Sequence, residues 1–593
     1  MKTKLKTDQR VGHRKGWSIA AVMLLWIAVG IAPSFAASLG ARQDDGATNR
    51  VHAKLAADLH SRNSNAMIDV IVQFRQKPQA SHYSRMSARG AFVKTKLHGI
   101  RAAAFRIPVS ALPALEADPD ILYVTPDRAV QLTNSDENYE SAVQADIAAS
   151  QYALDGTGVG VALIDSGVSD HLDLHNASGA SRVVYSQSFV AGDTSTVDAY
   201  GHGTHVAGIV AGNGTKSGSG SGYSVKHAGM APGANLINLR VLDANGSGSD
   251  SQVIAAIQQA IALKNQYNIR VINLSLGRPV FESFTLDPLC QAVEQAWQAG
   301  IVVVVAAGNN GRDNTYGTHG FATIGAPGND PAVITVGATR TLGTLTRVDD
   351  TIASYSSKGP TLLDHVAKPD LVAPGNRIGS LLAKGSTLDV NNPGLEEAPD
   401  SCSTCAASYF RLSGTSMATP VVTGAVALLV QQDATLTPDT VKARLMKTAW
   451  KGLTRYSTSY DVYNNAYNNQ FDLFTYGAGY LDVDAALGST DIASGVALSP
   501  TAVLNPSTGT ISMVNTNSVI WGNSVIWGNS VVWGNSVVWG NSTLLANSVI
   551  WGNSVVWGNA AQAQGYSVVW GNSVVWGNAT MNSAFSDGQD GEN

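Results

Sequence analysis

Ser416 stands in the stretch RLSGTSMATPVV (411–422), directly before an apolar run from Val421 to Val430. A serine in this position has two interpretations. It caps a buried helix, for which serine is a preferred residue, or it is a nucleophile. A nucleophilic serine needs a base that takes its proton and an acid that orients that base. The second interpretation therefore demands a histidine and a carboxylate elsewhere in the chain.

Two further stretches supply these partners. VALIDSGV ends an apolar strand at Asp165, and YGHGTHVAG places His202 at the head of an apolar helical run. A histidine can take the serine proton, while a buried carboxylate fixes its tautomer and stabilises the imidazolium. A helix that begins near Ser416 also offers free backbone N–H groups to a developing oxyanion. The stretch is not the G-x-S-x-G elbow of α/β-hydrolases, because Ala418 occupies the second position after the serine.

Alternating apolar runs and helical stretches must position these residues. We expect strands at 159–165, 234–242, 269–277, 300–309 and 332–338, with helices over 203–212, 250–265 and 287–299. Near-continuous apolar strands that alternate with helices predict a doubly wound, mostly parallel α/β sheet. Such sheets hold their sites at the carboxyl ends of the strands, which is where Asp165 lies.

Four blocks in one order resemble the signature blocks of the subtilisin-like serine proteases (subtilases): LIDSGV, GHGTHVAGIVAG, AAGNNG and SGTSMATPVVTGAVALL. The likeness covers roughly 150–488 and closes with YGAGYLDVDAAL, so we place the peptidase domain at 151–488. The resemblance implies a serine endopeptidase that hydrolyses polypeptides through an acyl-enzyme and requires no cofactor for the chemistry. In this family pattern Asp165 orients, His202 is the general base and then the acid, and Ser416 is the nucleophile.

The resemblance also implies roles outside the triad. Asn309 in AAGN would donate its side-chain amide to the oxyanion, the alternative being an ordinary turn residue. Ser275, Leu276 and Gly277 resemble the edge segment on which substrates pair as an added strand, the alternative being an ordinary sheet edge. We interpret His205, one turn after His202, as a packed structural residue.

The amino-terminal residues predict export. Residues 1–36 have a basic start, an apolar stretch from Trp17 to Ala32 and small residues before Ala36, the layout of a secretory signal peptide. The alternative is an uncleaved membrane anchor. With cleavage near Ala36, the protein would be secreted or held at the cell surface.

Residues 50–130 predict a small α+β unit, with strands at 67–74, 105–109 and 121–127 and helices around 84–98 and 110–118. The unit resembles the ferredoxin-like inhibitory pro-segment of the family, the alternative being an unrelated substrate-binding domain. The polar stretch 131–150 would then be a linker that carries the maturation site.

Metal and thiol chemistry are less defined. Family relatives bind calcium near the loop that corresponds to 212–232, together with an acid such as Asp173. This loop offers few carboxylates, so we assign no metal ligands and leave open whether a structural calcium ion binds here. Of the cysteines at 290, 402 and 405, an odd count leaves at least one thiol free. The C-x-x-C pair favours a small local disulfide over two free thiols.

A hexad, SVVWGN or SVIWGN, recurs eight times between 518 and 578. In an extended hexad, Val519 and Trp521 lie on one face, and Gly-Asn signals a turn. We expect a solenoid-like or stacking segment for attachment to a surface or for self-association, the alternative being a flexible tail. We expect a linker at 489–517 and a disordered tail at 579–593.

Composition excludes one class of function and leaves two. A net charge of −5 with 14% charged residues provides no basic excess for nucleic acid. One remaining hypothesis is a secreted, self-processing serine endopeptidase. The other is a surface-binding or self-associating repeat protein with an inactive protease-like scaffold. An inactive scaffold need not keep Asp165, His202, Asn309 and Ser416 together, so their joint presence favours the enzyme.

Overall fold

The computed structural model describes residues 54–56, 59, 66–127, 129–130, 139–314, 318–344, 346–402, 404–454, 456–461, 465–505, 510–514 and 543–545. The expected signal peptide, residues 131–138 of the expected linker, the expected tail at 579–593 and all but three residues of the hexad region lie outside these ranges. No helix in the described part of the chain is both long and apolar enough to cross a membrane.

A mostly parallel sheet forms the centre of the region from 139 to 505, as the sequence predicts. Its strand order is β13-β12-β11-β10-β6-β8-β7, and β14 also pairs with β12. Every neighbouring pair is parallel except β12 with β13. The strands are β6 (Gly160–Asp165), β7 (Val183–Ser188), β8 (Asn235–Arg240), β10 (Ile269–Leu274), β11 (Val302–Ala306), β12 (Ile334–Arg340), β13 (Thr351–Ile352) and β14 (Leu371–Pro374).

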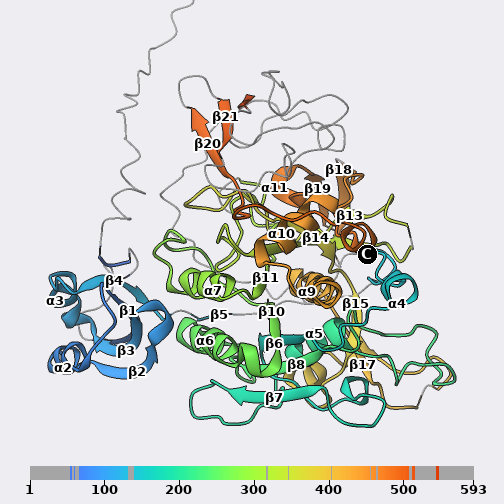
Figure 1. Cartoon of the computed structure of the whole chain (residues 1–593), viewed down its shortest axis with the longest axis horizontal. Coiled ribbons are helices and arrows are strands. Elements are labelled where there is room, and N and C mark those ends of the chain that lie inside the picture. The colour runs from blue at the N-terminus through green and yellow to red at the C-terminus, as the bar shows by residue number, and fades with distance from the viewer. Residues whose placement is uncertain are drawn as a thin grey trace, which may run out of the picture. The chain divides into compact units, whose positions relative to one another are not determined.

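Helices cover both faces of this sheet. Figure 1 shows α6 (Asp250–Tyr267) beside α7 (Pro288–Gln298) on one side of the central strands, with α5 (His202–Ala211) and α9 (Thr415–Gln432) on the other. Helix α9 packs against β10, β11, β12 and β14, and it is buried from Thr415 to Val430. A helix that is apolar on all sides belongs at the centre of a fold. This explains the long apolar run after Ser416.

Shorter elements complete this region. They are α4 (Ile147–Tyr152), η4 (Leu172–Leu174), α8 (Thr387–Asn391), η5 (Pro393–Leu395), α10 (Pro438–Thr448), α11 (Leu473–Tyr476) and α12 (Val483–Leu487). A three-stranded sheet has the order β15 (Ile378–Leu381), β17 (Tyr409–Leu412), β16 (Glu396–Glu397), and β18 (Tyr456–Tyr460) pairs with β19 (Ala466–Gln470). Strand β17 leads directly into α9.

The unit at 66–127 has a four-stranded antiparallel sheet of order β2-β3-β1-β4. Its elements are β1 (Met67–Phe74), α2 (Ala80–Ala88), β2 (Phe92–Leu97), η2 (His98–Ile100), β3 (Ala102–Pro108), η3 (Val109–Ala111), α3 (Leu112–Glu116) and β4 (Ile121–Pro126). The helix expected over 84–98 is wrong in its second half, where β2 lies. Strand β2 buries only Leu97, so it lacks the apolar alternation that reveals a half-buried strand.

Parts of both expected linkers pack on the sheet region. The Tyr139 hydroxyl donates to Ala228 O at 2.5 Å, and Val143 O accepts from Val483 N at 2.9 Å. On the carboxyl side, Ser499 N donates to Pro331 O at 2.9 Å. A three-stranded sheet follows, of order β20 (Thr501–Asn505), β21 (Thr510–Val514), β22 (Thr543–Leu545).

Candidate active site

The carboxyl edge of the sheet brings together the residues that the sequence singled out. Asp165 is the last residue of β6, His202 is the first residue of α5, and Ser416 is the second residue of α9. Helices α5 and α9 pack against each other. Asp165 and His202 therefore meet where a strand ends and a helix begins, and the helix that carries Ser416 packs against the helix that carries His202.

Asp165 and His202 form a buried pair. His202 Nδ1 lies 2.9 Å from Asp165 Oδ1 and 3.1 Å from Oδ2, and the two side chains are 0% and 2% exposed, respectively. The backbone N–H of Ser166 also donates to Asp165 Oδ1, at 2.7 Å. A carboxylate beside Nδ1 selects the tautomer with its proton on that nitrogen, which leaves a lone pair on Nε2. His202 Nε2 is buried without a hydrogen-bond partner among the described residues, so it is available to accept a proton.

The Ser416 hydroxyl points to a different partner in this state. Ser416 Oγ donates to Ser275 O at 3.1 Å, and Ser275 Oγ donates to Ser416 O at 2.8 Å. The carbonyl of Ser416 is open to that bond because Pro420, four residues later, has no N–H to close the helical turn. Catalytic hydrogen bonds are often absent or long before substrate binds.

Asn309 lies three residues after the end of β11 and faces the start of α9. Its Oδ1 accepts from Thr415 N at 2.9 Å and from Thr415 Oγ1 at 3.2 Å. A backbone N–H can only donate, so these contacts fix the oxygen of the amide on Thr415. The Nδ2 donors therefore point away from Thr415, and Ser416 N is among the helix-start N–H groups that lack a partner within the helix.

The predicted edge segment directly follows β10. Ser275 is fully buried and is held by Asn273, whose Nδ2 donates to Ser275 Oγ at 3.0 Å. The chain then pairs again at Arg278, whose N donates to Ala326 O at 3.0 Å and whose O accepts from Ala326 N at 2.7 Å. A Cβ at Gly277 would come within 2.9 Å of Ala326 O, so this close approach favours glycine.

Arg278 itself was not singled out by the sequence. Its guanidinium bonds Asp250 at 3.0 Å and Asp287 at 2.8–2.9 Å, and all three side chains are at most 1% exposed. Asp250 is the first residue of α6, and Asp287 is the N-cap of α7. The predicted edge segment is therefore fastened to two helices by a buried ion triad. Asp250 and Asp287 stand ahead of apolar helical patterns, which suggests helix capping and gives no sign of their common partner.

His205 is structural in its contacts. Its Nε2 lies 3.0 Å from Ile378 O and 2.9 Å from Phe410 O, two acceptors that require a proton on this nitrogen. Burial lowers the pKa of His205 to about 3, and the neighbouring His202 acts in the same direction. His205 is therefore neutral, and it fastens α5 to β15 and β17.

The residues near Asp173 do not fit a calcium ion. The Tyr409 hydroxyl donates to one Asp173 oxygen at 2.6 Å, and Lys216 N donates to the other at 2.7 Å. Hydrogen-bond donors thus occupy both oxygens that a cation would need. The described residues contain no cluster of three or more His, Cys, Asp or Glu side chains that could hold a metal ion.

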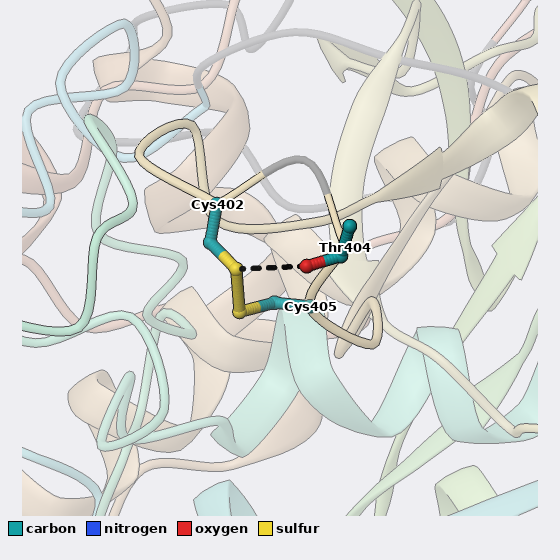
Figure 2. Close-up of a disulfide and its surroundings, with 3 residues drawn as sticks. All are labelled: Cys402, Thr404 and Cys405. Carbon is teal, nitrogen blue, oxygen red and sulfur yellow. Dashed lines mark hydrogen bonds between the residues drawn. A yellow bond between two sulfur atoms is a disulfide. The ribbon is translucent and has the colours of Figure 1, made fainter.

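The two neighbouring cysteines form the small disulfide that the sequence favours. Cys402 and Cys405 are bonded, and the Thr404 hydroxyl lies 3.9 Å from Cys402 Sγ (Figure 2). The disulfide closes a turn in the long connection between β15 and β17. Cys290 is a buried free thiol whose Sγ donates to Asn329 Oδ1 at 3.3 Å, and burial raises its pKa well above the ordinary value.

Comparison with known proteins agrees with this geometry. The model of the subtilase family, Peptidase_S8, matches residues 156–479. The chain is 38% identical over 363 residues to serine protease AprX of Bacillus subtilis, covering 60% of this chain and 75% of that protein. It is 34% identical over 386 residues to subtilisin E of the same species, covering 64% and 84%.

A solved structure has the same fold. Fervidolysin from Fervidobacterium pennivorans, described as a keratinolytic enzyme related to subtilisin, aligns with a TM-score of 0.54 and 21% identity, over 78% of this chain and 68% of that chain. The protein belongs to the subtilase family of serine proteases.

Proposed function

We propose that this protein is a secreted serine endopeptidase, made as a self-processing zymogen, that cuts polypeptides through an acyl-enzyme at Ser416. The observation that carries the proposal is the buried Asp165–His202 pair, which leaves His202 Nε2 unpartnered among the described residues at the amino end of α5. Helix α5 packs against α9, whose second residue is Ser416.

In the proposed reaction, Ser416 Oγ turns from Ser275 O toward His202 Nε2 and transfers its proton as it attacks the peptide carbonyl carbon. The new C–O bond pushes the carbonyl electron pair onto oxygen, and Asp165 stabilises the imidazolium. His202 then gives the proton to the leaving nitrogen as the C–N bond breaks. Water, deprotonated by His202, attacks the acyl-enzyme and releases Ser416.

Two donors would hold the oxyanion. Ser416 N lies at the amino end of an 18-residue helix, and Asn309 Nδ2 is turned away from Thr415 by the bonds to Oδ1. Pre-oriented donors of this kind stabilise charge that develops only in the transition state. The catalytic step needs no metal or cofactor.

Substrates would pair as an added strand against Ser275–Gly277. This segment lies between the end of β10 and the Arg278–Ala326 bridge, beside the carbonyl that now holds the Ser416 hydroxyl. Main-chain pairing accepts many side chains, which suits a general endopeptidase.

The ferredoxin-like unit would act as an intramolecular inhibitor. Gln73 Nε2 donates to Leu286 O at 2.6 Å, and Thr125 Oγ1 donates to Glu282 Oε1 at 2.6 Å. Asp127 accepts from Ser251 N at 2.7 Å near the start of α6. These contacts lie on α6 and on the connection that follows the proposed edge segment.

The chain leaving this unit also pairs with the peptidase domain. Strand β5 (Ala129–Val130) is antiparallel to β9 (Gly248–Ser249). Tyr139 and Val143 are already packed in the peptidase core. The maturation cut therefore falls between Val130 and Tyr139 in this proposal, a narrower range than 131–150.

The proposed export rests on the signal-like residues 1–36, and the repeats would serve self-association. The described part of the hexad region is β22, which pairs with β21. Sedimentation velocity on chains with and without residues 518–593 tests the second point. If both chains sediment as monomers, the proposed self-association through the repeats is contradicted.

The central experiment compares residues 38–593 with the same chain carrying Ser416→Ala. The wild-type chain should shorten by a cut between Val130 and Tyr139 and digest casein, while the variant stays full length and inactive. An Asn310→Ala chain, altered beside the proposed oxyanion donor, should behave as wild type. Equal trimming of wild type and Ser416→Ala, or no casein digestion by either, would contradict the proposal and favour an inactive scaffold.

A further inference from the structure

A second carboxylate, that of Asp198, lies beside the candidate triad. Asp198 is 2% exposed and precedes His202 by four residues. It accepts from Gly201 N at 2.7 Å, Thr204 N at 2.7 Å and Ser166 Oγ at 2.8 Å. Burial raises the pKa of Asp198, and the backbone donors of Thr204 and Gly201 act against that rise. Because these three partners donate, the group is best satisfied as a carboxylate.

Ser166 joins this carboxylate to Asp165. Its Oγ lies 2.8 Å from Asp198 Oδ1 and 3.2 Å from Asp165 Oδ1, and it accepts from Gly203 N at 2.9 Å. The hydroxyl has one proton, and the shorter distance directs it to Asp198. Asp165 Oδ1 is then left with the Ser166 N–H and His202 Nδ1.

These contacts fix the first turn of α5. The helix begins at His202, and its N-cap, Gly201, has no side chain with which to cap it. Asp198 accepts from the N–H groups of Gly201 and Thr204, and Ser166 accepts from that of Gly203, so one connected network satisfies these three helix-start donors. The backbone on both sides of His202 is therefore held by Asp198 and by the Ser166 that Asp198 orients.

We propose that Asp198 is a positioning residue for His202: it sets the imidazole against Asp165 through Ser166 and the first turn of α5, and its negative charge stabilises the protonated imidazole. The expected effect of Asp198 on turnover rests on the catalytic roles proposed above. Its effect on His202 does not, because that effect is measured by the protonation of the imidazole.

The other ionisable groups around α5 have a hydrogen-bond or ion-pair partner or are neutral. Asp173 on η4 is bonded to Tyr409, Arg240 on β8 to Asp193, and His205 is neutral. The elements α9 and β15, which pack against α5, contain no Asp, Glu, Lys or Arg. Asp165 and Asp198 are thus the carboxylates that bear directly on this turn.

The first test uses the inactive Ser416→Ala chain and follows the His202 Nδ1 proton by NMR during a pH titration. Replacing Asp198 by Asn should lower the pKa of His202 by about 0.5 unit or more, because an anion that favours the imidazolium is lost. Asp170→Asn, which removes a largely exposed carboxylate that bonds His175, should leave it unchanged. Equal shifts in the two variants, or none in Asp198→Asn, would overturn the proposal.

The second test uses the active enzyme. Asp198→Asn should move the acid limb of kcat/KM to lower pH and lower kcat by about 10-fold or more, with KM nearly constant. Ser166→Ala keeps the charges of Asp165 and Asp198, so it should lower kcat without moving the acid limb. This variant replaces Asp198→Asn as the test if Asp198→Asn does not fold. A loss of stability alone, with kcat and the acid limb unchanged, would reduce Asp198 to a helix cap.

Discussion

Replacing Arg278 by Met removes the buried guanidinium that bonds both Asp250 and Asp287. Methionine fills similar volume, so the main loss is electrostatic, and each carboxylate loses two hydrogen bonds to a charged donor. Breaking a buried ion pair by removing one partner costs about 3–5 kcal/mol. Asp287 keeps the N–H of Leu289 at 2.9 Å.

The pH dependence makes this expectation sharper. A buried carboxylate that has lost its cation can take up a proton, which at pH 7 costs at most about 4 kcal/mol because the ordinary Asp pKa is about 3.9. At pH 5 the same protonation costs only about 1.5 kcal/mol. A carboxyl whose folded pKa is raised loses stability as pH rises. The destabilisation by Arg278→Met should therefore be about 3–5 kcal/mol at pH 7 and shrink toward about 1.5 kcal/mol at pH 5.

Urea unfolding of the Ser416→Ala chain, with and without Arg278→Met, measures this destabilisation at the two pH values. Arg270→Met is the matched control, because Arg270 is half-buried and its hydrogen bonds within the described part of the chain go to the carbonyls of Ala434 and Leu436. Its cost should be small and nearly independent of pH. A loss of unfolding free energy below about 1 kcal/mol at pH 7, or a loss that grows on acidification, would refute the conclusion that the ion triad of Arg278, Asp250 and Asp287 stabilises the fold.

Three further predictions address single residues. Asn309→Ala should lower kcat by about 100- to 1000-fold with little change in KM, measured on a peptide amide against Asn310→Ala, whereas a rise in KM alone would argue against an oxyanion role. His205, whose folded pKa is about 3, is neutral in the native state. Its contribution is complete above about pH 6.5 and falls by about 1.4 kcal/mol per pH unit below it, so urea midpoints should fall more steeply with acid than in His205→Gln. Asp127→Asn removes the carboxylate of the proposed pro-segment that accepts from Ser251 N, which should shorten the lag before the proposed self-trimming by several-fold; an unchanged lag in a time course on gels would place the contacts that hold this unit elsewhere.

The sheet and the meeting of Asp165, His202 and Ser416 could be predicted because each depends on short-range patterns. Continuous apolar strands are long enough to be recognised, and parallel strands bring their carboxyl ends to one edge. Strand β2 escaped recognition because only Leu97 is buried, so its pattern carries no periodicity. The packing of the linker residues was not predicted, because a polar composition does not reveal which residues will be buried against other segments. Ser499 and Tyr139 are buried by partners that are distant in the chain.

Long-range polar contacts limited the prediction of the site. Asp198 lies close to His202 in sequence, but its role depends on Ser166, which lies on another strand end. Arg278 follows the predicted SLG edge directly, yet its partners sit at the starts of two helices. Single charged residues in such places look like caps or surface groups, because hydrogen bonds between different elements leave no periodic signal in the sequence.

The long connection between β15 and β17 has a mechanical consequence for the site. Within it, Thr387 N donates to Ala199 O at 3.0 Å and Leu388 N to Tyr200 O at 2.9 Å, so α8 is fastened to the residues just before His202. The same connection returns as β17, whose last residue lies four positions before Ser416. One connection thus braces the backbone next to His202 and next to Ser416. Its ends are fixed by pairing while the disulfide turn lies between them, so changes in length near Cys402 and Cys405 need not alter the positions of His202 and Ser416.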